Sequence, residues 1–375
     1  MQAVVMREHL KEGLQIVERA VGRNPSLAAL QNVLAVAEEN KIKLAATDLQ
    51  IGVICEFLAN TTQKGSVVFA PRFVSPLLSV INEQHVSLEG REEGLEIRAG
   101  SFHTTLRTAN ADEFPIIPTP KEADLFIEIQ AGVLCKGLSQ VVGMAGQSQA
   151  RPEIGGVFFV FEKELLRVVA TDSFRLAEKK LVFEKPNEKE QSFILPQRTA
   201  KELISIFGER QGRVKVYISP SQVVFDYTNQ EEALPLRIQV VSRLIDGEYP
   251  DYQNVIPKDH KTKIVIVKEE FIAHVKAASV FAGKTSELVL VVDASKKTVS
   301  CNSKSVEAGE NHSSLKAEVT GQNVAVAFNW RFLLEGLLQM RDSRCELMLN
   351  GEDGPALLRP GEQEGYVYVI MPIKA

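Results

Sequence analysis

The chain has 375 residues, a net charge of −5 and a hydrophobic fraction of 45%, which is ordinary for a globular protein. No apolar run approaches 18 residues, and the charged start "MQAVVMREHL" is unlike a secretory signal, so the sequence predicts neither a membrane span nor export. An acidic net charge by itself argues against a basic nucleic-acid binder. The widely spaced cysteines, without a CxxC pair, are expected to be reduced and buried in a cytosolic protein: Cys55, Cys135, Cys301 and Cys345.

The first third of the chain predicts a helix, a hairpin, a strand and a second helix. A helix is expected over 8–23, because Leu10, Leu14 and Val17 recur at the spacing of one helical face. The runs "NVLAVA" and "KIKLAA", joined by "EEN", predict a hairpin. A short strand then ends at Pro71, and Arg72 opens a helix expected over 72–81.

The same plan occurs twice more along the chain. Helices are expected over 133–151 and 197–213 in the second copy, and over 268–284 and 330–344 in the third. Hairpins are predicted by "GVFFVF" with "LLRVVA" and by "ELVLVV" with "KTVSCN". A period of this length indicates a domain. The sequence therefore predicts an α+β protein with three tandem copies of a two-helix, antiparallel-sheet domain, at 1–123, 124–258 and 259–375.

Two copies share an Ala-Thr-Asp turn after a strand, in "ATDLQIGV" (46–53) and "ATDSFRLA" (170–177). Thr and Asp side chains bond nearby backbone amides, so either turn alone could be coincidence. The repeat favours matching turns. In the third copy, Cys301-Asn302-Ser303 is expected to form the corresponding, weaker turn.

No catalytic constellation is evident: the chain lacks a GxxxxGKS loop, a GxSxG elbow and an HExxH pair. Its six histidines are scattered singly, and neither a metal nor a cofactor is expected. The six expected helices carry +7 and the remainder −12. This contrast favours weak, sequence-independent contact with phosphates through the helices, although chance explains basic helix ends equally well.

The threefold repeat, "ATDSFRLA", "LIDGEYPDYQNVIP" and the final "YVIMPIKA" together resemble the bacterial sliding clamp family, the beta subunit of DNA polymerase III, over the whole chain. The resemblance implies a head-to-tail homodimeric ring with helices inside and sheets outside. Such a ring encircles double-stranded DNA without sequence preference and acts as a non-enzymatic processivity factor at the nucleoid, in the cytoplasm. Its implied partners are the replicative polymerase, an ATP-driven clamp loader, repair polymerases and other proteins with a clamp-binding motif.

The resemblance also implies three sets of site residues. A cleft for partner peptides would be lined by Ile154, Thr171, Phe174, Arg175, Leu176, Pro250, Val255, Asn329, Phe332, Val369, Met371, Pro372 and Ile373. The turn after Asp172 is expected to present Phe174, Arg175 and Leu176 at the surface. DNA contacts would come from Arg23, Arg72, Gln149, Arg151, Arg198, Lys201, Arg210 and Arg331. The dimer interface would hold Phe102 and Leu106 of one subunit against Lys276, Val280 and Phe281 of the other.

Three features depart from the family pattern. The stretch "FHTTLRTANADEFP" (102–115) is longer than usual at the edge strand expected to meet the other subunit. The loop "ARPEIGG" has Pro152 and Glu153 where aromatic residues are common, and the chain ends in the small Ala375. Two other functions fit the residues alone: a monomeric three-repeat scaffold that binds proteins but not DNA, and an enzyme with an unrecognised site. Oligomeric state separates the scaffold from the clamp.

Overall fold

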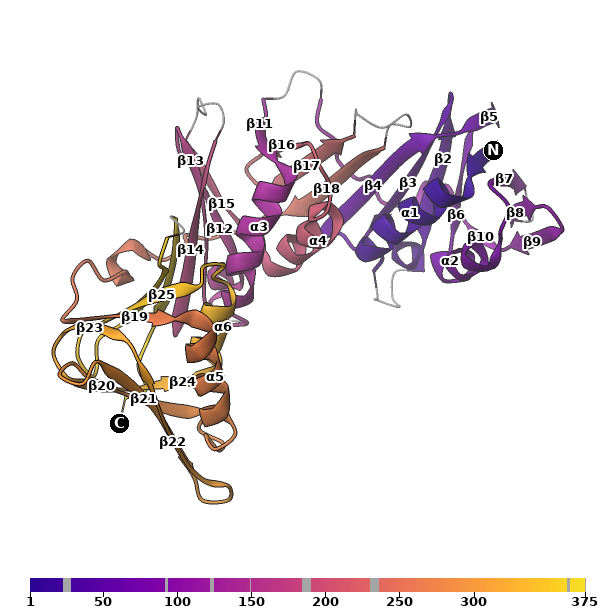
Figure 1. Ribbon diagram of the computed structural model, residues 1–375. Coiled ribbons are helices and arrows are strands. Elements are labelled where there is room, and N and C mark those ends of the chain that lie inside the picture. The colour runs from indigo at the N-terminus through magenta and orange to yellow at the C-terminus, as the bar shows by residue number, and fades with distance from the viewer. Residues whose placement is uncertain are drawn as a thin grey trace. The chain divides into compact units, whose positions relative to one another are not determined.

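The computed structural model describes residues 1–22, 28–91, 94–121, 125–148, 150–183, 190–229, 236–362 and 365–374. It confirms an α+β chain of helices and antiparallel sheets (Figure 1). Two compact units are present. The first comprises Met1–Cys135 with Glu202–Leu244, and the second comprises Lys136–Lys201 with Ile245–Ala375.

All six expected helices are present, but each ends earlier than the sequence predicted: α1 (Arg7–Val17), α2 (Pro71–Val80), α3 (Ala131–Val141), α4 (Gln197–Phe207), α5 (Lys268–Ser279) and α6 (Trp330–Leu338). Short 3₁₀ turns follow α1 and α3, at Glu18–Ala20 and Val142–Met144. Several basic residues counted with the helices lie beyond these ends, so the charge contrast is smaller than predicted: Arg151, Arg210, Arg213, Arg341 and Arg344. None of the described helices is long and apolar enough to cross a membrane.

The apolar helix faces are buried as predicted. Leu10, Leu14 and Val17 of α1 are at most 1% exposed. The equivalent side chains of α3 and α5 are equally buried: Leu134, Leu138, Val141, Phe271, Val275 and Ala278. Burying one large apolar side chain contributes about 1.5–3 kcal/mol, so these faces hold each helix on its sheet.

The first unit contains two antiparallel sheets. One has the order β5 (Asn60–Gln63), β1 (Gln2–Met6), β7 (His85–Arg91), β8 (Gly94–Ala99), β9 (Phe102–Leu106). The other has the order β10 (Thr108–Ala109), β6 (Gly65–Phe69), β2 (Val33–Glu38), β3 (Lys41–Thr47), β4 (Ile51–Leu58), β18 (Arg237–Arg243), β17 (Gln222–Thr228), β16 (Arg213–Ile218), β11 (Ile127–Gln130). The pairing of β4 with β18 joins the first copy to the second in one sheet.

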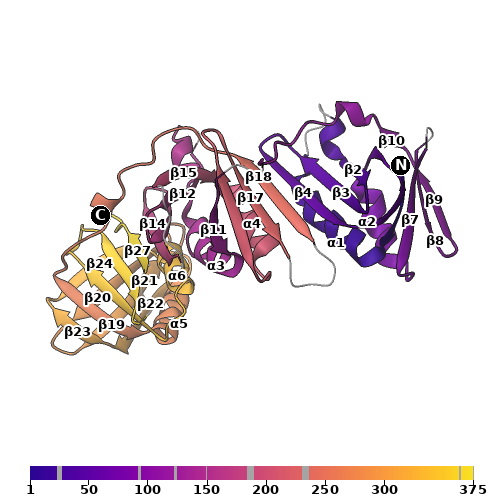
Figure 2. The ribbon, with the colours of Figure 1, turned by 90° about the horizontal axis from the view of Figure 1, so that it is seen from above.

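The second unit is built in the same way (Figure 2). Its large sheet has the order β15 (Gln191–Pro196), β12 (Gly156–Phe161), β13 (Leu165–Thr171), β14 (Arg175–Val182), β27 (Tyr366–Ile370), β26 (Ala356–Pro360), β25 (Arg344–Leu349), β19 (Thr262–Val267), β23 (Glu318–Gly321). The small sheet has the order β22 (Gly309–Lys316), β21 (Thr298–Ser305), β20 (Glu287–Asp293), β24 (Val324–Asn329). Here β14 and β27 join the second copy to the third.

The predicted hairpins are confirmed as β2–β3, β12–β13 and β20–β21. A strand that the sequence analysis missed opens every copy: β1, β11 and β19. These strands have only four to six residues and run directly into a helix, so the helical pattern obscured their alternation.

The turn predicted at Cys301-Asn302-Ser303 is wrong. All three residues lie within β21 and pair with β22, and the chain turns only at 306–308. Through the strand pairing Asn302 matches Val169, so Lys304 and Ser305 take the places of Thr171 and Asp172. The turn begins there, with Ser305 Oγ accepting the amides of Glu307 and Ala308.

The four cysteines are free and buried, and their thiols are expected to be unreactive in the folded protein. Burial raises the pKa of Cys135, Cys301 and Cys345 to about 12, and it also raises the pKa of Cys55. At pH 8 the thiols therefore stay protonated, and a thiolate-specific disulfide reagent should label none of them before urea unfolds the chain. Prompt labelling of a native thiol would contradict this assignment.

Candidate partner-binding surface

The two Ala-Thr-Asp turns have the same hydrogen bonds. In the second copy, Asp172 Oδ1 accepts bonds from the amides of Phe174 and Arg175, both at 3.0 Å. Thr171 Oγ1 donates to the carbonyl of Arg175 at 2.7 Å and accepts the amide of Ser173 at 3.1 Å. The first copy repeats each bond with Thr47 and Asp48. The predicted match between the turns is confirmed.

Arg175 connects this turn to α6 of the third copy. Its Nε donates to Asp172 Oδ2 at 2.9 Å, and its Nη1 forms an ion pair with Glu335. The guanidinium lies 4.3 Å from the centroid of the Phe332 ring, and the Arg175 side chain is only 10% exposed. The turn is thus held by a cation–π contact and two ion pairs.

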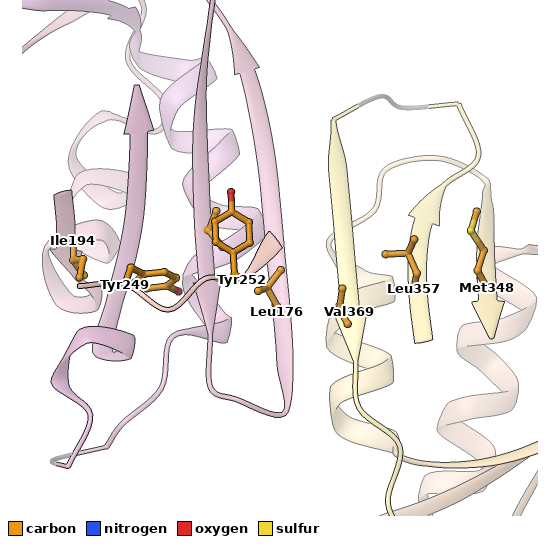
Figure 3. Packing of buried hydrophobic residues seen from close by; sticks show 8 residues of the cluster. Leu176, Ile194, Tyr249, Tyr252, Met348, Leu357 and Val369 are labelled. Carbon is orange, nitrogen blue, oxygen red and sulfur yellow. The ribbon is translucent and has the colours of Figure 1, made fainter. Parts of the chain in front are cut away.

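The prediction that Leu176 faces solvent is wrong, because Leu176 is 3% exposed. It pairs across the strands with Val369, and the row continues through Leu357 to Met348. All four side chains belong to one buried cluster, called here the apolar ladder (Figure 3). Successive side chains of a strand point to opposite faces of the sheet. The side chain of Leu176 therefore points into this cluster, while those of Arg175 and Ala177 point to the other face.

The segment 245–257 contributes two tyrosines to the same cluster. Tyr249 stacks on Phe158 with centroids 4.6 Å apart. Tyr252 donates its hydroxyl to Glu178 at 2.7 Å, and burial together with this bond raises the pKa of Tyr252 to about 12. The segment is thereby fixed against the sheet.

Several apolar side chains remain at the surface near the ladder. Phe174 is 62% exposed, and its ring centroid lies 6.5 Å from that of Phe332. The amide of Met371 donates to the carbonyl of Phe174 at 2.9 Å, so the C-terminal segment runs beside the turn. Val255 is 43% exposed, and Phe332, Met371 and Ile373 are half-buried. The sequence also predicts Arg175 at the surface, but its side chain is only 10% exposed, because Asp172, Glu335 and the Phe332 ring enclose it.

The other predicted cleft residues lie in the same unit. Ile154 is buried, and its carbonyl and that of Thr171 both accept the amide of Gly146. Pro250 lies in the segment 245–257, and Pro372 is buried. Asn329 caps α6, since its side chain accepts the amide of Arg331 at 3.0 Å.

The predicted DNA-contacting residues fall into three groups. Arg23 and Gln149 lie outside the described residues. Arg72, Arg198, Lys201 and Arg331 are exposed in the first turns of α2, α4 and α6. Arg210 and Arg151 form ion pairs within the chain.

Arg210 is 20% exposed and pairs with Glu12 at 2.7 Å, which is typical of a structural role. Arg151 bonds Glu153 at 3.2 Å and the hydroxyl of Ser173 at 3.1 Å. Arg151 therefore lies against the turn at 172–175 rather than on a helix.

The predicted dimer residues lie at open positions of both units. Phe102 and Leu106 are on β9, which has β8 as its one strand partner in the described chain. Lys276 is in the last turn of α5, and Val280, which is 69% exposed, and Phe281 follow it. The nearby sheet edge is β22, against which α5 packs.

Sequence reasoning missed Met348, Leu357, Ile194 and Glu335. The apolar residues of "CELML" and "PALLRP" indicate side chains that face a core. They do not indicate that this core lies where β14 of the second copy pairs with β27 of the third. Glu335 gave no signal, because an ion pair 160 residues apart in sequence leaves no local pattern.

Three family models cover nearly the whole chain. They describe the N-terminal, central and C-terminal domains of the DNA polymerase III beta subunit and match residues 1–118, 128–251 and 253–374. The chain is 26% identical over 385 residues to a beta sliding clamp of Bacillus subtilis, with 100% of both chains covered. It is 25% identical to a beta sliding clamp of Synechococcus elongatus, with 100% and 99% covered.

Solved structures of sliding clamps have the same fold as this chain. The DNA polymerase sliding clamp of Bacillus subtilis has a TM-score of 0.93 at 26% identity, and the beta subunit of Thermotoga maritima has 0.90 at 26%. Each comparison covers 100% of this chain and 99% of the other. These matches and the repeated fold define a clamp-type protein. The chain belongs to the DNA polymerase III beta subunit family.

Proposed function

We propose that the chain is a DNA polymerase processivity factor that acts as a head-to-tail homodimeric ring around duplex DNA. In this proposal the three domains are 1–123, 124–258 and 259–375. The ring has no catalytic site of its own. It acts at the nucleoid, where it tethers the replicative polymerase, the loader and repair polymerases.

One observation carries the ring: the pairing of strands between consecutive copies. The fourth strand of the first copy pairs with the last strand of the second, as β4 with β18. The fourth strand of the second copy pairs with the last strand of the third, as β14 with β27. In the described chain, β22 and β9 are the equivalent strands without such a neighbour. A second copy would supply it, and two identical head-to-tail contacts close a ring.

The exposed cations at the starts of α2, α4 and α6 support contact with phosphates. Arg72, Arg198 and Arg331 occupy matching positions in the three copies. Few cations give weak, salt-sensitive and sequence-independent binding. That suffices when a closed ring retains the DNA topologically.

The exposed side chains beside the apolar ladder support a peptide-binding role. Phe174, Val255 and Met371 could receive leucine and phenylalanine anchors of a short partner segment. Burying two such anchors yields about 3–6 kcal/mol before ordering costs, which gives exchangeable binding.

The topology of retention tests this function. The chain is loaded by its cognate loader on a nicked circular plasmid, and the complex is isolated by gel filtration before and after linearisation with a restriction enzyme. Retention on the circle and loss from the linear form are expected. A monomeric scaffold would be retained on neither, and a conventional DNA binder would be retained on both.

The proposed contact between β9 and the partner subunit gives a second prediction, which concerns the strength of the dimer. Replacing Phe102 and Leu106 together with aspartate should raise the dimer dissociation constant by at least about 100-fold, because two apolar side chains lose their burial. Sedimentation velocity measures the change. Ile116→Asp is the control, since Ile116 is 95% exposed and belongs to neither β9 nor β22. A double variant that stays dimeric at wild-type concentrations would place the interface elsewhere.

A further inference from the structure

We propose that the dimer holds a divalent transition-metal ion, best matched by Zn²⁺, between His103 of one subunit and His312 of the partner subunit, with Glu310 of the partner subunit as a third ligand. The proposal rests on the head-to-tail dimer proposed above. It follows from the strand registers within the two units and from the groups around the two histidines.

The register at the two junctions within the chain is known. Ile54 of β4 lies opposite Gln239 of β18. Glu178 of β14 lies opposite Val367 of β27. If the three copies are equivalent, the residue of β22 in the place of Ile54 should lie opposite the residue of β9 in the place of Gln239.

The residue of β22 that corresponds to Ile54 of β4 is His312. In each copy, a row of directly paired residues can be followed across four adjacent strands, starting from the residue three positions before the second helix. This row is called the path. The three paths are Val68–Leu34–Ala45–Ile54, Ile194–Phe158–Val169–Glu178 and Ala327–Val289–Asn302–His312.

The residue of β9 that corresponds to Gln239 of β18 is His103. Here the path starts three residues before the first helix of each copy. Two paths are Val4–Ser87–Arg98–His103 and Glu128–Lys215–Asp226–Gln239. The third, Val265–Glu346–Arg359–Val367, needs the β26–β27 register continued by one residue.

Antiparallel pairing of β9 with β22 therefore sets His103 directly opposite His312 of the partner subunit. Directly opposite residues have Cβ atoms about 4.5–5.5 Å apart, which lets two imidazoles share one metal ion. Both side chains are exposed in the single chain, and that of His103 is 61% exposed. Phe102 and Leu106 point to the other face of β9, so the apolar contact and the histidine pair do not compete.

The surroundings of His103 prepare it as a ligand. Its Nε2 is hydrogen-bonded to Glu96, whose side chain is only 4% exposed. Arg98 Nε donates to the same carboxylate at 2.5 Å. Glu96 also pairs with Arg91 at 2.9 Å. A carboxylate that fixes one ring nitrogen leaves Nδ1 for a metal, as in carboxylate–histidine–zinc arrangements.

The surroundings of His312 supply the rest of the donor set. Glu310 is two residues away on the same face of β22. Both border a cavity of about 440 Å³, together with Glu287, Asn302 and Lys304. Asn302 Oδ1 is buried there without a hydrogen-bond partner in the described chain. Two imidazoles, a carboxylate and a water bound in this cavity form a four-coordinate zinc set, and Asn302 could accept a hydrogen bond from that water.

A single chain does not complete the set. Its described residues hold no group of three metal-binding side chains. The site therefore exists only where two subunits meet, and metal binding stabilises the dimer by linkage.

The test measures the dimer dissociation constant by sedimentation velocity in EDTA and at free zinc of about ten times the site's Kd. Each occupied site should strengthen the contact by about tenfold, with roughly one zinc per interface by mass spectrometry. His103→Ala and His312→Ala should each abolish this strengthening. His85→Ala, an exposed histidine elsewhere on the sheet of β9, should not.

Mixed dimers give the decisive measurement. A dimer of one His103→Ala subunit and one His312→Ala subunit keeps one complete histidine pair, so it should recover roughly one zinc per dimer. Neither variant homodimer should bind zinc at this concentration. A dimer in EDTA that zinc neither binds nor stabilises overturns the metal site and leaves the ring intact. A chain that is monomeric in EDTA and zinc alike overturns the ring itself.

Discussion

Replacing Phe174 and Met371 together with alanine is expected to weaken binding of a polymerase-derived peptide by about 100-fold. Phe174 is 62% exposed, and the Met371 amide is bonded to its carbonyl, so both side chains border the same surface. Losing their contact area removes about 2–4 kcal/mol of binding free energy. Fluorescence anisotropy of a labelled peptide with leucine and phenylalanine anchors measures the loss.

Val182→Ala is the matched control for this variant. Val182 ends the same strand that follows Phe174, and it is 78% exposed. It should leave peptide affinity unchanged, and both variants should unfold at the wild-type temperature. Wild-type affinity in the Phe174/Met371 variant would show that partners bind at another surface.

The two junctions within the chain differ in chemistry, and this difference favours one of them for apolar partners. At the first junction, Asp226 is 5% exposed and accepts two bonds from Arg237, at 3.0 and 2.6 Å. Gln239 adds a bond to the same carboxylate at 3.1 Å. These polar groups satisfy one another and offer little to a leucine or phenylalanine anchor. The apolar ladder has an apolar counterpart here, because Val241 and Val224 take the places of Val369 and Leu357, so along this row the junctions differ at the turn residue.

The turn residues reinforce this contrast. Gly52 takes the place of Leu176, since the first pairs with Val241 and the second with Val369. A Cβ on Gly52 would lie 2.9 Å from Ile117, so the side chain of Ile117 occupies that space. The first junction is therefore filled by its own closing segment.

Local patterns predicted most of the fold. The amphipathic spacing of Leu10, Leu14 and Val17, the hairpins and the Thr-Asp turns depend on residues close in sequence, and all were confirmed. The helix ends were placed too late, because polar residues after a helix can continue its pattern without continuing its hydrogen bonds.

Long-range features could not be predicted in the same way. The burial of Leu176 depends on Val369, which is adjacent only after β14 pairs with β27. The roles of Arg151 and Arg210 depend on Ser173 and Glu12, which are distant in sequence. A charge pattern cannot distinguish a cation that is exposed from one that already has a partner.

Leu176→Ala is expected to lower the free energy of unfolding of the second unit by about 2–5 kcal/mol, while leaving the first unit unchanged. The substitution removes the side chain at the Leu176 end of the apolar ladder, and a buried cavity adds to the lost transfer free energy. The single tryptophan, Trp330, begins α6 in this unit, so its fluorescence during urea unfolding reports the change. Val182→Ala should stay within about 0.5 kcal/mol of wild type, because its side chain is exposed. Phe174→Ala should also keep wild-type stability, because Phe174 is exposed while Leu176, two residues later, is buried. A loss below about 1 kcal/mol for Leu176→Ala would mean that the ladder does not hold the two copies together.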